Sequence, residues 1–167
     1  SNGDGKVNSG ETAWAFFGMR RGGSTYYALD ISDRANPKLL WSKGNADYPS
    51  LGQTWSQPKV IYVNHPSYAD KPLLVFGAGY DKKQFEEGGA NTVGAGVYLV
   101  DAETGDKVWS TDDIAFAGKD SIVGRIATLD SDYDGYTDRL YAADVAGKIW
   151  RIDLAGTNTT EWSAFEF

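Results

Sequence analysis

Residues Val97 to Trp109 read V-Y-L-V-D-A-E-T-G-D-K-V-W. This stretch begins with an apolar run, turns through a polar segment that contains Thr104 and Gly105, and ends in a second short run that carries a tryptophan. Short apolar runs on either side of Asp and Gly residues are typical of antiparallel strands joined by a turn. The stretch therefore predicts a β-hairpin.

The same pattern occurs twice more in the chain. Tyr26 to Trp41 reads Y-Y-A-L-D-I-S-D-R-A-N-P-K-L-L-W, and Ile149 to Trp162 reads I-W-R-I-D-L-A-G-T-N-T-T-E-W. Each copy has a strand, an aspartate, a turn and a second strand with a tryptophan, and another strand pair precedes it. Repeats of this kind indicate β-propeller blades. We expect Trp41, Trp109 and Trp162 to pack between neighbouring blades rather than to bind a ligand.

The rest of the chain has the same β character. Short apolar runs separated by Gly, Asp, Asn and Pro predict about eleven strands, and long helical periodicity is missing. Residues 64–71 and 80–95 are predicted loops, and the second is long enough to be mobile or functional. About three blades fit in the chain, whereas a closed propeller needs at least about four. We therefore predict that residues 1–167 are a single segment of a larger propeller.

An acidic stretch from Asp130 to Asp138 reads D-S-D-Y-D-G-Y-T-D. Its carboxylates occupy positions 1, 3, 5 and 9 of a calcium loop, a carbonyl is available at position 7, and a glycine at position 6 permits the sharp turn. The predicted ligands are Asp130, Asp132, Asp134, the Tyr136 carbonyl and Asp138. A strand-like sequence follows, so the loop resembles an EF-hand in its ligands but belongs to a β-protein. The alternative is a solvated acidic turn, since Asp and Gly are also common turn residues.

A second loop of this type is predicted at the N-terminus, in S-N-G-D-G-K-V-N-S-G-E. The candidate ligands, at positions 3, 5, 7, 9 and 12, are Asn2, Asp4, the Lys6 carbonyl, Asn8 and Glu11. Position 1 would precede Ser1, so we expect the chain to be part of a longer protein. The loop is a second calcium site only if an acidic residue comes first. A flexible polar terminus is the alternative.

Composition restricts the classes of function. A formal net charge of −7 and a pI near 4.6 argue against nucleic acid or an anionic membrane surface as the main partner. No apolar run approaches the roughly 18 residues of a membrane span, and the absence of cysteine excludes thiolate chemistry. The single histidine, His65, lies beside a proline, and we expect it to face solvent and not to serve a catalytic triad. The chain is therefore not expected to be an enzyme.

Two surface elements are candidates for docking. Arg20 and Arg21 form the one basic feature, and they could bind a partner carboxylate bidentately. Pairing with Asp residues of a neighbouring blade is the alternative. The long polar loop over residues 80–95 is the other candidate, because binding residues are often found on loops.

The hairpin pattern strand-Asp-x-x-Thr-Gly-x-x-x-Trp resembles the blades of quinoprotein-like β-propellers, which indicates only an all-β fold. More specific are the segment from Phe17 to Trp41, L-G-Q-T-W-S-Q-P at Leu51 to Pro58, G-A-G-Y-D at Gly77 to Asp81, and the acidic loop running into R-L-Y-A-A-D-V-A-G-K-I-W-R-I-D-L. In this order, over nearly the whole chain, they resemble the C-terminal propeller of the PilC/PilY-type proteins of bacterial type IV pili.

This resemblance implies a secreted protein at the bacterial cell surface, at the pilus tip or associated with the outer membrane. It implies a role in promoting pilus assembly, opposing retraction and supporting adhesion and twitching motility, with Ca²⁺ bound at Asp130 to Asp138. The implied partners are minor pilins of the tip complex and a host or abiotic surface. An Arg-Gly-Asp triplet is absent, so receptor binding is not implied. The alternatives are a quinoprotein-type dehydrogenase and an outer-membrane assembly factor of the same fold.

Overall fold

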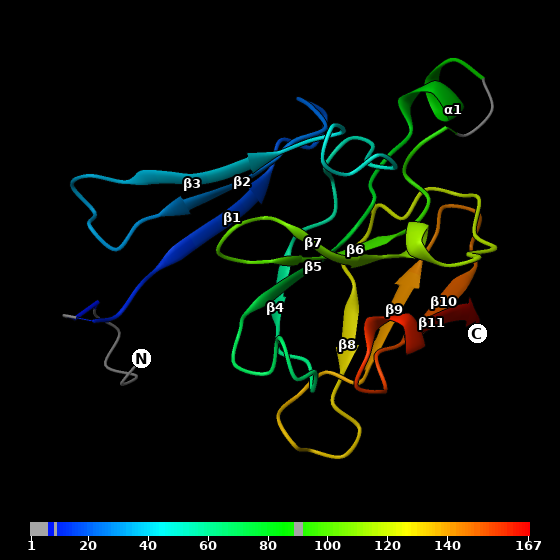
Figure 1. Ribbon diagram of the computed structural model, residues 1–167. Coiled ribbons are helices and arrows are strands. Elements are labelled where there is room, and N and C mark those ends of the chain that lie inside the picture. The colour runs from blue at the N-terminus through cyan, green and yellow to red at the C-terminus, as the bar shows by residue number, and fades with distance from the viewer. Residues whose placement is uncertain (1–6, 9, 89–91) are drawn as a thin grey trace.

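The computed structural model describes residues 7–8, 10–88 and 92–167, and three antiparallel sheets make up most of it (Figure 1). The first sheet contains β1 (Trp14–Gly18), β2 (Tyr26–Asp30) and β3 (Lys38–Lys43). The second contains β4 (Lys59–Ile61), β5 (Leu73–Gly77), β6 (Val97–Asp101) and β7 (Lys107–Ser110). The third contains β8 (Ala127–Leu129), β9 (Arg139–Ala143), β10 (Ile149–Asp153) and β11 (Ser163–Glu166). These sheets confirm the prediction of about eleven strands in about three blades.

The strands of each sheet follow one another in chain order, as in the blades of a propeller. The second and third sheets begin with the short strands β4 and β8, which pair with β5 and β9. In the first sheet β1 holds the place of β5 and β9. Within the described residues, β1 pairs only with β2, and no strand pairs with the other edge of β1. The three sheets are therefore a partial propeller.

Short helical turns interrupt the loops. Helix α1 (Lys82–Glu86) lies inside the predicted long loop, and the 3₁₀ turns η1 (Thr111–Asp113) and η2 (Thr159–Glu161) follow β7 and β10. No helix in the described part of the chain is long and apolar enough to cross a membrane.

The second sheet forms the centre of the molecule because both of its faces are buried. Side chains alternate between the two faces of a strand. Accordingly, Leu73 and Val75 of β5 join the core shared with the third sheet, whereas Leu74 and Phe76 join the core shared with the first. All four are completely buried. This explains why β5 reads as a continuous apolar run rather than an alternating one.

Trp41 and Gly105 show how the first blade packs on the second. The Trp41 indole N–H of the first sheet donates to the Ala102 carbonyl of the second sheet, at 3.0 Å. Its ring lies on Gly105, where a Cβ atom would come within 2.7 Å of Trp41 Cδ2. Gly105 also has a φ of +71°, a left-handed conformation that glycine adopts at little cost. The turn of one blade is thus the packing surface for the tryptophan of the preceding blade.

Trp109 and Trp162 confirm the prediction that the tryptophans pack in the core. Each is only 2% exposed, and both belong to the core between the second and third sheets. Their ring centroids lie 5.9 Å apart in an edge-to-face arrangement, which is favourable for aromatic pairs.

The third hairpin nevertheless departs from the expected repeat. In the first two hairpins the tryptophan of the second strand, β3 or β7, lies opposite a residue of the first strand. That residue comes two positions before the aspartate that ends the first strand. In the third hairpin that place, opposite Arg151, is held by Phe165. Trp162 instead directly follows η2 and precedes β11, because η2 lengthens the turn. The prediction that a strand carries Trp162 was therefore wrong.

Candidate metal centre

The acidic loop connects β8 to β9 and is fixed at its ends by backbone hydrogen bonds (Figure 1). The Asp138 N–H donates to the Leu129 carbonyl at 2.9 Å, which closes the loop at the end of β8. The Thr137 N–H donates to the Tyr62 carbonyl, and the Asp138 carbonyl accepts from Leu154 N–H. Tyr62 follows β4 and Leu154 follows β10, so the loop is anchored to both the second and the third sheets.

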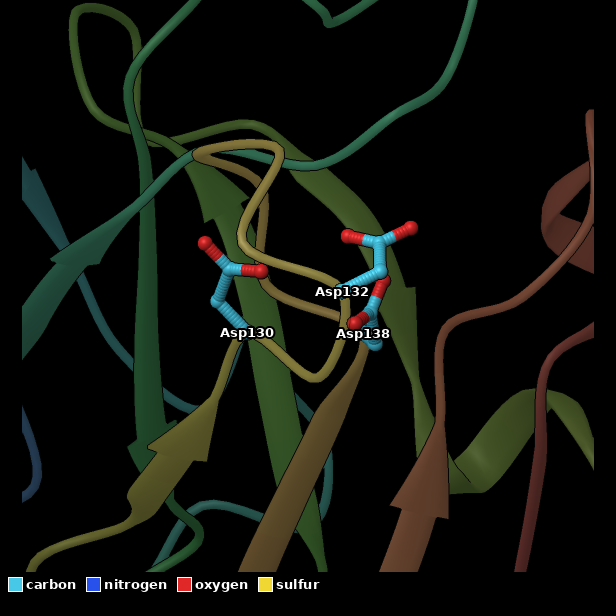
Figure 2. A group of neighbouring side chains, drawn as sticks. All are labelled: Asp130, Asp132 and Asp138. Carbon is cyan, nitrogen blue, oxygen red and sulfur yellow. The ribbon is translucent and has the colours of Figure 1, made fainter.

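Three carboxylates of the loop converge, as Figure 2 shows. One oxygen each from Asp130, Asp132 and Asp138 lies within 4.8 Å of the others. Calcium binds its oxygen ligands at about 2.3–2.6 Å, so one ion could contact all three. A cavity of about 290 Å³ adjoins Asp132 and Asp138, and it leaves room for the water ligands that calcium commonly retains. The residues present therefore fit a calcium ion.

The other two predicted ligands lie beside this group of three. The Asp134 carboxylate accepts from the Asn64 side-chain amide at 3.3 Å and from the Tyr136 N–H at 2.8 Å. Asp134 lines the same cavity as Asp132 and Asp138 but is not one of the three converging carboxylates. Its role as a ligand, and that of the Tyr136 carbonyl, stay predictions.

The backbone of the loop adopts the turn that the glycine predicted. Gly135 has a φ of +93°, and Tyr133, which is 91% exposed, has a φ of +64°. The Asp130 carboxylate accepts from the Tyr133 N–H at 2.7 Å and from the Gly135 N–H at 2.9 Å. These local bonds curl the chain around the first acidic residue, as Asp side chains often do in turns.

Asp138 is held in its ionised form. The Ser131 hydroxyl and N–H both donate to its carboxylate, at 2.5 Å and 2.6 Å, and these bonds lower the pKa of Asp138. A carboxylate that accepts such bonds is favoured over the neutral acid. The last carboxylate of the loop therefore carries the negative charge that a cation ligand needs.

The predicted N-terminal loop is only partly covered by the described residues. Asn2, Asp4 and Lys6 lie outside them. The Asn8 N–H donates to the Glu11 carboxylate, and the Glu11 N–H donates to the Asn8 carbonyl, both at 3.0 Å. The loop leads into β1, which holds the place of β9 in its sheet, so the two candidate loops precede equivalent strands. The internal repeat of the sequence could have shown this correspondence.

His65 is not solvent-facing, and this prediction was wrong. The side chain is 9% exposed, and its ring lies 4.9 Å from that of Tyr68 and 6.0 Å from that of Trp162. Its Nδ1 atom accepts from the Ser67 N–H at 3.1 Å. The ring covers the edge of the core between the second and third sheets, and so its contacts are structural.

The two adjacent arginines have different surroundings. Arg21 pairs with Glu86 of α1 at 3.1 Å, which joins the two candidate docking elements. Arg21 is thus paired within the chain, but with a glutamate rather than with the aspartate that was predicted. The Arg20 guanidinium lies 5.9 Å from the centre of the Trp55 ring, and Trp55 is 39% exposed. The sequence had not singled out Trp55 as a functional residue. It is a tryptophan outside the hairpin pattern, and that was the available signal.

Comparisons with known proteins agree with this architecture. The sequence model of a family described as "PilY1 beta-propeller domain" matches residues 6–165. The chain is similar to the type IV pilus biogenesis factor PilY1 of Pseudomonas aeruginosa, with 31% identity over 136 residues, which is 81% of the chain and 11% of that protein. A PilY1 homologue from Xylella fastidiosa is 28% identical over 158 residues, or 87% of the chain and 10% of that protein.

A solved structure shows the same similarity. The crystal structure of the Pseudomonas aeruginosa PilY1 C-terminal domain aligns with a TM-score of 0.66 and 27% sequence identity, covering 89% of the chain and 30% of that structure's chain. The chain thus spans about a tenth of the curated relatives that it matches.

Proposed function

Since the chain belongs to the PilY1 β-propeller domain family, we propose that it is a calcium-binding part of the propeller of a type IV pilus biogenesis protein. The single observation that carries the metal assignment is the convergence of Asp130, Asp132 and Asp138 within 4.8 Å. Like charges at this separation repel one another unless a cation lies among them. Asp134 and the Tyr136 carbonyl complete the proposed ligand set.

Calcium would supply positive charge at the centre of the loop. With four carboxylates around one divalent ion, the local charge would fall from about −4 to about −2. Residues of the chain anchor the loop. Asp138 is hydrogen-bonded to the end of β8 and to the residue after β10, and Asp134 is hydrogen-bonded to Asn64 in the segment that follows β4. Bound calcium would therefore stabilise the contact between two blades as well as the loop.

The proposed role of the parent protein is to promote pilus assembly and oppose retraction, and thereby to support adhesion and twitching motility. The relatives are named type IV pilus biogenesis factors, and this name supports the assignment. Minor pilins of the pilus tip complex are the proposed partners. A host or abiotic surface is the proposed adhesion target, and the outer surface of the cell is the proposed location.

We propose no catalytic activity for the chain. The relatives are named as biogenesis factors, and the only histidine of the chain is used in packing. A quinoprotein-type dehydrogenase is the alternative with the same fold, and turnover of alcohol or sugar substrates with added quinone would support it. An outer-membrane assembly factor would leave the acidic loop unexplained.

The test of this function is an Asp134→Ala substitution in the intact parent protein. We expect fewer surface pili or altered retraction than in the wild-type strain, while Asp70→Ala, an exposed acid outside the loop, leaves both unchanged. Co-purification of the parent protein with minor pilins should likewise be reduced by Asp134→Ala and unchanged by Asp70→Ala. Normal piliation in a variant shown by calorimetry to have lost calcium would reject the regulatory role and leave the metal assignment intact.

A further inference from the structure

Two adjoining cavities lie where the segment from Thr54 to Pro58 passes β1 and enters β4. The first measures about 240 Å³ and is lined by apolar side chains that include Phe17 and Trp55. The second measures about 290 Å³ and lies further along, towards β8. Gln57 and Pro58 line both, so the cavities form one continuous depression.

The charge of this depression differs from that of the protein as a whole. Arg20 lines the first cavity, and Lys59 and Arg125 line the second. No Asp or Glu among the described residues lines either cavity, although the chain has 23 acidic residues and 16 basic ones. Within the described part of the chain, none of the three cations forms an ion pair. The depression is therefore a basic surface on an acidic protein.

Arg20 breaks the internal repeat at this place. Gly18 and Gly77 end the equivalent strands β1 and β5. In both copies the residue two positions later donates its N–H to the segment that leads into the next sheet, to the Thr54 carbonyl before β4 and to the Ile122 carbonyl before β8. In the second copy that residue is Gly79, with a φ of +96°, whereas in the first it is Arg20, with a φ of +50°. A left-handed arginine is strained, and residues held in such conformations cluster at functional sites.

The strained arginine is placed against an exposed aromatic ring. Its guanidinium lies 5.9 Å from the centre of the Trp55 ring, within the range of a cation–π contact. An arginine in contact with a ring face keeps N–H donors that can form two parallel hydrogen bonds with a carboxylate. Arg and Trp are also the residue types most enriched where binding energy concentrates in interfaces.

We propose that this depression, from Arg20 and Trp55 to Lys59 and Arg125, binds an extended acidic peptide segment of a partner protein. A carboxylate of the segment pairs with Arg20, a neighbouring apolar side chain enters the cavity beside Trp55, and a second carboxylate reaches Lys59 or Arg125. Two hollows along one depression suit an extended peptide, because such peptides are recognised through pockets for alternate side chains.

The proposal can be tested with the 167-residue chain and two synthetic peptides. The probe is acetyl-Gly-Asp-Phe-Asp-Gly-amide, and its matched control carries Asn in place of both Asp residues. The indole N–H resonance of Trp55, assigned by Trp55→Phe, should shift on titration with the acidic peptide and not with the control. Added salt should weaken the shift, because screening reduces the attraction between exposed charges.

Arg20→Gly provides the sharpest variant, because glycine fits the left-handed backbone without strain. We expect affinity for the acidic peptide to fall roughly tenfold, a change that corresponds to about 1.4 kcal/mol. The melting temperature should be unchanged or higher. Arg34→Ala, which removes an exposed arginine elsewhere, should bind as the wild type does. Arg20→Gln keeps a long polar side chain but removes the charge, and should also lose affinity.

Several results would overturn the proposal. They are equal shifts with both peptides, full binding by Arg20→Gly or Arg20→Gln, or complete competition by an equal concentration of inorganic phosphate, which would indicate a general anion site. A clear fall in the melting temperature of Arg20→Gly would assign Arg20 a structural role instead. These measurements need neither added calcium nor pilus proteins, so they can fail while the proposed function stands.

Discussion

At the scale of single residues, the contact between Trp41 and Gly105 shows how two blades are joined. The tryptophan belongs to the first hairpin and the Thr104-Gly105 turn to the second, so the two residues that meet belong to different hairpins. The glycine serves two purposes at once, since it supplies a left-handed turn and leaves room for a neighbouring ring. The turn therefore joins two blades as well as closing its own hairpin.

Substitution of Gly105 should reveal this double role. Gly105→Ala forces a left-handed alanine and places its Cβ 2.7 Å from Trp41 Cδ2, so Trp41 must move. We expect a loss of about 2–4 kcal/mol in the free energy of unfolding, which combines backbone strain with overpacking. Denaturant titration measures this loss of free energy. Gly147→Ala is the matched control, because Gly147 has a φ of +90° but nothing within 4 Å of the added Cβ.

Gly147→Ala should lose only the contribution of backbone strain to the free energy of unfolding, about 1–2 kcal/mol. Equal losses for Gly105→Ala and Gly147→Ala would show that the contact with Trp41 contributes nothing to stability.

At the scale of elements, the long loop between β5 and β6 owes its shape to a single buried carboxylate. Asp81 is 2% exposed and accepts from the N–H of Lys83 at 2.8 Å, near the start of α1. It also accepts from the N–H groups of Thr92 and Val93, at 2.7 Å and 3.3 Å, on the far side of the loop. One side chain thus ties together both ends of the segment that presents Glu86 to Arg21.

Asp81→Ala should loosen this segment and leave the sheets in place. The three hydrogen bonds that are lost are partly buried, so each loss costs less than the roughly 1–3 kcal/mol of a fully buried group. We expect faster hydrogen exchange across residues 82–93, with unchanged protection of β5 and β6. Asp33→Ala is the control, because the Asp33 carboxylate accepts only the Ala35 N–H in an exposed turn. Unaltered exchange in residues 82–93 would contradict this role of Asp81.

The strands were predictable from the sequence, whereas some side-chain environments were not. Each strand is a short apolar run between turn residues, and that signal is local. The acidic loop was recognisable for the same reason, since its candidate ligands lie within nine residues. The burial of His65 and the place of Trp162 depend on contacts between sheets that are distant in sequence. The strained backbone of Arg20 became visible only when the equivalent strands were aligned in space.

At the scale of the whole molecule, the acidic loop lies at a junction that depends on non-local contacts. The sheets pack in chain order, and the loop is bonded to the last residue of β8 and to residues that follow β4 and β10. Bound calcium would therefore stabilise the packing of the second sheet on the third, not only nine residues of loop. By mass action, calcium at about a hundred times its dissociation constant would add about 2.7 kcal/mol to the free energy of unfolding. That is a sizeable share of a domain's net stability.

The calcium site can be tested by calcium titration of the wild-type chain, Asp132→Ala and Asp70→Ala, followed by calorimetry and thermal unfolding. Asp132 is one of the three converging carboxylates, whereas Asp70 is an exposed acid outside the loop, so both variants lose one negative charge. We expect calcium to bind to the wild type and to Asp70→Ala and to raise the melting temperature of both. Asp132→Ala should lose most of the affinity and the stabilisation. Equal calcium affinity in all three proteins would contradict calcium binding at this loop.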